Sequence, residues 1–236
     1  MAQFLLSAHS FVCHTAGYAV FLDLRRDTYS VLDPGDVAML SGWIRGWADG
    51  VPLHAPNTPD ATGRAVAMKL LSAGLITDDE VHGKSATAVV AVPAEYSLRD
   101  GSYAACPLSI RDVLRFIRAW LVVTLMLRCW PLERTVGRVY RRSKPRLWAD
   151  DDFERARALA SVYFRLQPRM FSPIDACLRN SLTFVEFLSC YALYPTWMFG
   201  VRMLPEWAAH SWVQQEDVVL NDTVAHVNIY TPIMAV

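Results

Sequence analysis

The sequence predicts an α+β protein with two domains. A strand-rich segment followed by helices opens the chain, and helices followed by three strand-like runs close it. Charge also differs between the two parts: residues 1–100 carry 11 acidic and 7 basic side chains, whereas residues 101–236 carry 12 and 16. We therefore place an N-terminal domain at residues 1–83, a linker at 84–107 and a C-terminal domain at 108–236.

The N-terminal domain is predicted to be winged-helix-like. Residues 18–24 and 28–32 are rich in β-forming side chains and are separated by a polar Arg-Arg-Asp turn, which predicts a hairpin. Capping residues then predict helices at residues 37–47 and 61–73. A short strand at residues 75–77 would complete the domain as its wing.

Residues 84–107 contain glycines, prolines and small side chains, which is typical of a linker. Residues 109–129 then predict a helix with aliphatic side chains at helical spacing. These side chains are Ile110, Leu114, Ile117, Leu121 and Leu125. Six cations lie within residues 134–146; such a run is either a solvated face or a surface for an acidic partner. Asp152 is a candidate N-cap for a helix reaching about Leu166.

Composition argues against several classes of function. Net charge is zero and the pI about 7.0, and the acidic N-terminal domain would repel phosphates, so no nucleic-acid partner is expected. The five cysteines lack a C-x-x-C spacing, so neither a disulfide framework nor a metal site is predicted, and a reducing cytoplasm fits best. The longest apolar run, residues 119–127, is too short to span a bilayer.

Cys177, His210 and Asp222 form a candidate catalytic triad. Cys177 begins a helical pattern, His210 lies in the strand-like residues 208–213, and Asp222 follows the next apolar run. A thiol attacks carbonyls as its thiolate, so it needs an imidazole to take its proton and a carboxylate to orient that imidazole. Strand alternation places His210 and Trp212 on one face. His226 is the competing base.

The N-terminal pattern resembles a known group of domains. Residues 18–24, 28–32 and 70–76 are similar to the leader-recognition domains of peptide-maturation enzymes, a group related to the pyrroloquinoline-quinone precursor chaperone. The resemblance implies that a precursor's leader peptide adds as a strand beside the hairpin, by β-augmentation. We place the groove for this leader at Tyr29, Val31, Met68 and Leu71.

The C-terminal blocks resemble the transglutaminase-like peptidases of lasso-peptide biosynthesis. These blocks are residues 177–182, 199–202, 209–213 and 220–222. With the N-terminal domain, the chain resembles the fused B protein of that pathway, which joins leader recognition and peptidase in one chain. One departure is Asn180, because many relatives have arginine three residues after the cysteine.

The resemblance implies a leader peptidase. Cys177 would be the nucleophile, His210 the base and then the acid, and Asp222 the orienting carboxylate. The implied partners are a precursor peptide and an asparagine-synthetase-like cyclase, which forms the lactam ring. No cofactor is predicted, and a dependence on ATP stays open. Two alternatives remain: a transglutaminase or acyltransferase with the same triad, and a non-catalytic leader-binding module.

Overall fold

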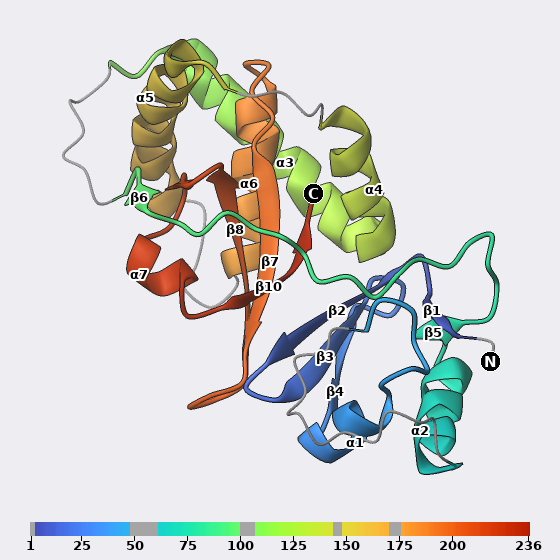
Figure 1. Ribbon diagram of the computed structural model, residues 1–236. Coiled ribbons are helices and arrows are strands. Elements are labelled where there is room, and N and C mark those ends of the chain that lie inside the picture. Colours follow the sequence, from blue (N-terminus) through green and yellow to red (C-terminus); the bar gives the residue numbers. More distant parts are fainter. Residues whose placement is uncertain (1–2, 48–60, 100–106, 144–147, 170–175) are drawn as a thin grey trace. The chain divides into compact units, whose positions relative to one another are not determined.

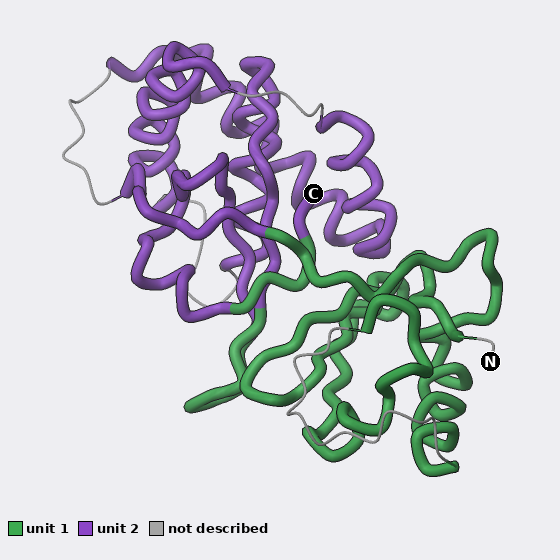
Figure 2. Tube along the Cα trace, in the orientation of Figure 1, with its two compact units in different colours: residues 1–90, 201–208, 231–234 green, residues 91–200, 209–230, 235–236 purple. Residues whose placement is uncertain are grey.

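The computed structural model describes the chain in five stretches and divides it into two compact units (Figure 2). The described residues are 3–47, 61–99, 107–143, 148–169 and 176–236. Unit 1 comprises residues 1–90, 201–208 and 231–234, and unit 2 comprises residues 91–200, 209–230 and 235–236.

Unit 1 contains an antiparallel three-stranded sheet in the order β2-β3-β4 (Figure 1). Its strands are β2 (Ser10–Thr15), β3 (Tyr18–Asp23) and β4 (Thr28–Leu32). The predicted hairpin is confirmed, since β3 pairs with β4 from Asp23↔Thr28 to Ala19↔Leu32. Its turn is held by the buried carboxylate of Asp23, which accepts the backbone N–H of Arg25 at 2.8 Å.

The helices of unit 1 are α1 (Pro34–Met39) and α2 (Ala61–Ser72). The prediction of a helix at residues 37–47 was wrong: α1 starts earlier and ends at Met39. Gly42 and Gly46 have φ of 78° and 73°, which is left-handed backbone that a right-handed helix cannot contain. The predicted cap of the second helix, residues 58–60, lies outside the described residues.

A second, two-stranded sheet pairs β1 (Leu5–Leu6) with β5 (Ile76–Thr77). The strand predicted at residues 75–77 is therefore present, and its partner is the start of the chain. Leu6, Phe21, Ile44, Val66 and Leu70 belong to one buried cluster that joins both sheets and α2.

Four long helices lie in the described part of unit 2. They are α3 (Ile110–Cys129), α4 (Leu132–Arg142), α5 (Asp150–Leu166) and α6 (Ala176–Ser189). Ser109 caps α3, accepting the N–H of Asp112 at 3.2 Å. α5 begins two residues before the predicted cap Asp152, which instead accepts the N–H of Ala149 from within the first turn. Two short helices, η1 (Gln167–Arg169) and α7 (Val224–Val227), complete the helical elements described.

The aliphatic stripe predicted on α3 does not face the core. Phe116, Ala119, Val123 and Met126 are the buried residues of this helix, which packs against α5 and α6. The five predicted aliphatic residues are exposed, with Leu121 53% accessible. A helix with apolar residues on two faces can pack through either face, and α3 packs through the face that carries Phe116.

The basic segment is partly internal to unit 2. Arg138 and Arg142 on α4 both pair with Glu186 on α6, whose side chain is only 2% exposed. The guanidinium of Arg134 lies 4.3 Å from the ring centroid of Trp130. Arg138 and Arg142 therefore fasten α4 to α6, and the rest of the run includes Arg141, which is exposed.

A five-stranded sheet in the order β10-β7-β8-β9-β6 lies in front of α6 in Figure 1. Its strands are β6 (Tyr96–Ser97), β7 (Thr196–Arg202), β8 (Ala208–Gln215), β9 (Val218–Val219) and β10 (Thr231–Ala235). β6 lies within residues 84–107, the predicted linker; it pairs in parallel with β9 and is followed by the buried Leu98. Among the described residues, no helix is long and apolar enough to cross a membrane.

Candidate active site

Cys177 is the second residue of α6, in the first turn as the sequence predicts. Backbone N–H groups at a helix start have no intrahelical partner, and the helix dipole there favours negative charge. The thiol also receives hydrogen bonds from the backbone of Ser211 and Leu178. This environment stabilises a thiolate.

The structure brings Cys177, His210 and Asp222 together within unit 2. His210 on β8 hydrogen-bonds the Cys177 thiol, and its Nε2 lies 2.6 Å from Oδ2 of Asp222. Because a carboxylate only accepts, Nε2 of His210 must be the donor in that contact. The remaining ring nitrogen, Nδ1, is then the one available to the thiol. This is the order of contacts that a thiol–imidazole–carboxylate triad requires.

The pKa values of the three groups move together. Burial alone would raise the pKa of Cys177, but the hydrogen bond and charge of His210 outweigh it and lower that pKa. Burial opposes the imidazolium of His210, yet the bonds to Asp222 and Cys177 raise its pKa to about 9. Burial also opposes ionisation of Asp222, but His210 and the N–H of Thr223 lower its pKa to about 2. The lowered pKa of the thiol and the raised pKa of the imidazole both favour a thiolate paired with an imidazolium.

A buried hydroxyl pair joins α6 to the strands. Ser181 lies one turn after Cys177, and its Oγ is 2.5 Å from Oγ of Ser211, the neighbour of His210. Trp197 on β7 donates from Nε1 to the Ser181 hydroxyl at 2.9 Å. The Ser211 hydroxyl also donates to the Cys177 carbonyl at 3.4 Å. These bonds fix the start of α6 against β8.

Aromatic rings surround the imidazole of His210. Trp212 stacks with it, with a centroid separation of 5.9 Å and an interplanar angle of 13°, which confirms that the two residues share one face of β8. The ring of Tyr230 lies 5.0 Å away. Gly200 on β7 leaves room for both, because a Cβ there would lie 2.9 Å from the Trp212 ring and 3.0 Å from Cβ of Tyr230.

The loop that carries Asp222 is tied at three points. Asn221, which is buried, accepts the backbone N–H of Val213 at 2.7 Å through its side chain. The backbone N–H of Thr223 donates to Oδ1 of Asp222 at 2.7 Å. Ser97 on β6 donates from its hydroxyl to the Asp222 carbonyl at 2.6 Å. The carboxylate is therefore held by its neighbours, not by a regular strand.

Asn180 is the residue at which the sequence departs from the resemblance described above. The hydroxyl of the fully buried Tyr163 on α5 donates to the Asn180 carbonyl at 2.9 Å and lies 2.7 Å from its side-chain Oδ1. Asn180 thus fastens α5 to the first turns of α6, a structural contact that an arginine could not make in the same way.

His226 contacts Asp222 as well. Its Nδ1 lies 3.0 Å from each of the two carboxylate oxygens, and its ring centroid is 4.6 Å from that of His210. The nitrogen and oxygen ligand atoms of His210, Asp222 and His226 lie within 4.8 Å of one another. Among the described residues, these three form the cluster that could hold a metal ion. The sequence predicted no metal site at these residues.

The four residues predicted for the leader groove lie in unit 1. Tyr29 and Val31 are on β4, and Met68 and Leu71 are on α2. Val31 and Met68 are exposed, at 42% and 47%, whereas Leu71 packs against the core of the unit. The Tyr29 ring contacts the ring of Trp207 at a centroid distance of 5.5 Å.

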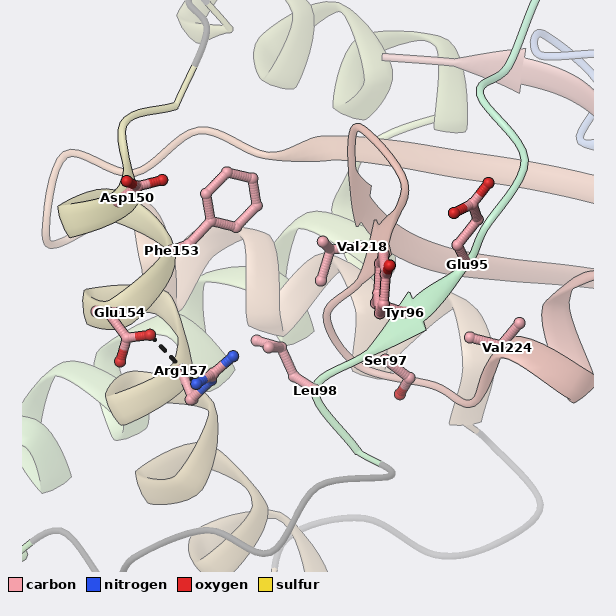
Figure 3. Close-up of a pocket in the computed structure, with 10 residues that line it drawn as sticks. All are labelled: Glu95, Tyr96, Ser97, Leu98, Asp150, Phe153, Glu154, Arg157, Val218 and Val224. Carbon is pink, nitrogen blue, oxygen red and sulfur yellow. Dashed lines mark ion pairs between the residues drawn. The ribbon is translucent and has the colours of Figure 1, made fainter.

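A cavity of about 680 Å³ lies beside β6, β9 and the start of α5 (Figure 3). Leu98, Phe153, Val218 and Val224 contribute apolar walls, and an ion pair between Glu154 and Arg157, 3.2 Å apart, lines it. Cys177 and His210 do not line this cavity. Ser97 does, and because it bonds the Asp222 carbonyl, the cavity adjoins the loop that carries the carboxylate.

Comparison with known families gives the C-terminal part its assignment. Residues 119–235 match the family model of the transglutaminase-like superfamily. This segment is a transglutaminase-like domain. It includes Cys177, His210 and Asp222, and the superfamily includes cysteine peptidases and transferases. No curated protein and no solved structure gave a significant match to the chain.

Proposed function

We propose that this chain is a leader peptidase, which removes the leader of a lasso-peptide precursor. The observation that carries the proposal is the hydrogen-bonded series Cys177–His210–Asp222 inside a transglutaminase-like domain. A thiolate beside an imidazolium is the resting state of a thiol nucleophile, ready to attack a peptide carbonyl without a separate deprotonation step.

The reaction would proceed in two halves. The Cys177 thiolate attacks the carbonyl carbon of the last leader residue and forms a C–S bond, while the backbone N–H of Cys177 stabilises the oxyanion. His210 gives its proton to the leaving amine as the C–N bond breaks, so the core departs with a free N-terminus. Water, deprotonated by neutral His210, then hydrolyses the thioester and returns the thiolate. Asp222 keeps the imidazole oriented throughout.

In this proposal, a winged-helix-like domain at residues 1–83 recognises the leader. β4 is the last strand of its three-stranded sheet among the described residues, and an extended leader would add as a strand along that side of the sheet. The exposed side chains of Val31 and Met68 would contact that strand. Binding the leader here would raise the effective concentration of the cleavage site at Cys177. An asparagine-synthetase-like cyclase would then consume the freed amine.

The test is mass spectrometry of a candidate precursor encoded beside this protein, incubated with wild type and with Cys177→Ala. We expect one cut at the end of the leader, producing a leader with a free carboxylate, and no cut by the variant. Cys190→Ala, a cysteine just beyond the other end of α6, is the matched control and should cleave normally. Cleavage by Cys177→Ala at the wild-type rate would overturn the proposal.

Two further arms separate the alternatives. With a primary alkylamine such as cadaverine present, an acyltransferase would yield mainly the leader–amine adduct, whereas a peptidase would still yield mainly the free acid. A precursor that binds but stays intact, with the cyclase and ATP also supplied, would indicate a leader-binding module without peptidase activity.

A further inference from the structure

We propose that His226 is a positioning residue, which holds the Asp222 carboxylate in the orientation that His210 requires. This inference rests on the catalytic roles proposed above for Cys177, His210 and Asp222. His226 was considered from the sequence only as a competing base, whereas its contacts are with the carboxylate.

The hydrogen-bond donors around Asp222 can be assigned. The carboxylate has its pKa at about 2, so it is ionised and acts only as an acceptor. Nδ1 of His226, 3.0 Å from both oxygens, must therefore carry a proton, as must Nε2 of His210 at 2.6 Å. With the N–H of Thr223 at 2.7 Å from Oδ1, three donors converge on one carboxylate.

The local fold explains why such a contact is needed. Asp222 lies between β9 and α7, outside both elements, so neighbouring side chains decide how its carboxylate is turned. Thr223 caps α7, accepting the N–H of His226 at 3.3 Å through its hydroxyl. This cap fixes the first turn of α7 and brings His226, four residues after Asp222, back over the carboxylate. Without the hydrogen bond from His226, the carboxylate could rotate away from Nε2 of His210.

A second His–Asp pair in the chain provides a matched comparison. In unit 1, Nδ1 of His82 lies 2.7 Å from Oδ2 of Asp79, three residues earlier. Both imidazoles are exposed, with the His82 side chain 78% accessible and the His226 side chain 45% accessible. It shares the local chemistry of the His226–Asp222 pair but belongs to unit 1, whereas Cys177 and His210 belong to unit 2.

The experiment measures the rate at which iodoacetamide alkylates Cys177 at about pH 6, where an ordinary thiol is almost fully protonated. Mass spectrometry of the Cys177 peptide follows the alkylation over time. The variants are His226→Ala, His226→Asn and His226→Gln. The Asn amide nitrogen can replace Nδ1 of the imidazole, whereas Gln places its amide nearer the position of Nε2. We expect alkylation about tenfold slower in the Ala and Gln variants and within about twofold of wild type in the Asn variant.

His82→Ala should leave the rate unchanged, and unfolding midpoints identify any variant that fails to fold. The proposal is overturned if His226→Ala reacts at the wild-type rate, or if all three variants are slowed equally, since that would indicate a structural role for the imidazole alone. The readout needs no peptide substrate. If the variants alkylate as expected but the wild-type protein cleaves no precursor, the inference about His226 stands and the proposed leader-peptidase function is refuted.

Discussion

The hydroxyls of Ser181 and Ser211 lie 2.5 Å apart inside unit 2, and one of them follows Cys177 by a helical turn while the other is adjacent to His210. Both residues are buried, and Ser181 also accepts the indole N–H of Trp197 at 2.9 Å. The distance between thiol and imidazole therefore depends on a polar contact that neither of them makes directly.

Ser181→Ala is expected to destabilise the fold by about 1–3 kcal/mol, because it leaves the Trp197 indole and the Ser211 hydroxyl without this partner in a buried environment. It should also slow alkylation of Cys177. Chemical denaturation and the alkylation rate check the two effects. The control is Ser189→Ala on the same helix, whose hydroxyl bonds only the Glu186 carbonyl one turn back and whose loss should change stability by less than about 0.5 kcal/mol. Equal effects in both variants would contradict the special role of Ser181.

The pH dependence of cleavage should be broad. Catalysis needs the Cys177 thiolate and the His210 imidazolium, so activity falls below the lowered pKa of the thiol and falls again as pH rises through about 9, where His210 loses its proton. The measurement is kcat/KM for precursor cleavage against pH. A basic limb near 6.5, the ordinary pKa of histidine, would mean that Asp222 and Cys177 do not raise the pKa of His210 in solution.

Gly200→Ala should damage the site through the aromatic rings. The added methyl group would lie 2.9 Å from the Trp212 ring, closer than carbon atoms approach, so Trp212 and Tyr230 must move away from the imidazole they surround. We expect a loss of about 1–3 kcal/mol in unfolding free energy together with reduced activity.

Gly137→Ala is the matched control for that substitution. Gly137 lies within α4 and has nothing within 4 Å of an added Cβ. Alanine there should stabilise the helix by about 0.5–1 kcal/mol and leave activity unchanged. If both substitutions destabilise the protein alike, the crowding at Gly200 is not the cause.

Features with a local pattern could be predicted from the sequence. The hairpin of β3 and β4 follows from two runs of β-formers around a polar turn, and the strand-like residues 208–213 lie within β8. Strand alternation placed His210 beside Trp212, and the structure stacks the two rings. In each case the information lies within a few consecutive residues.

Features that depend on distant partners could not be predicted. β6 has two residues and becomes a strand only by pairing with β9, about 120 residues later. Nothing in the composition of residues 84–107 indicates this strand, so the segment resembles a linker. Ser181 has the appearance of an ordinary small residue on an apolar helix until Ser211 and Trp197 are placed beside it. On α3, periodicity identified an apolar face, but only the neighbouring helices α5 and α6 determine which of two apolar faces is packed.

The last prediction concerns the cations of α4. The sequence alone left open whether this run of like charges is a solvated face, whereas the structure pairs two of them with a buried carboxylate. Glu186 is almost completely buried and pairs with both Arg138 and Arg142. Glu186→Ala would leave two arginines facing each other, but their side chains are 33% and 31% exposed and water can reach them. We therefore expect a loss of about 1–3 kcal/mol, below the 3–5 kcal/mol typical of a fully buried pair. Arg141→Gln, at an exposed position of the same helix, should change the unfolding free energy by less than about 0.5 kcal/mol. Urea denaturation of both variants measures the change in unfolding free energy. Similar small losses of unfolding free energy in the two variants would mean that Arg138 and Arg142 belong to a solvated surface.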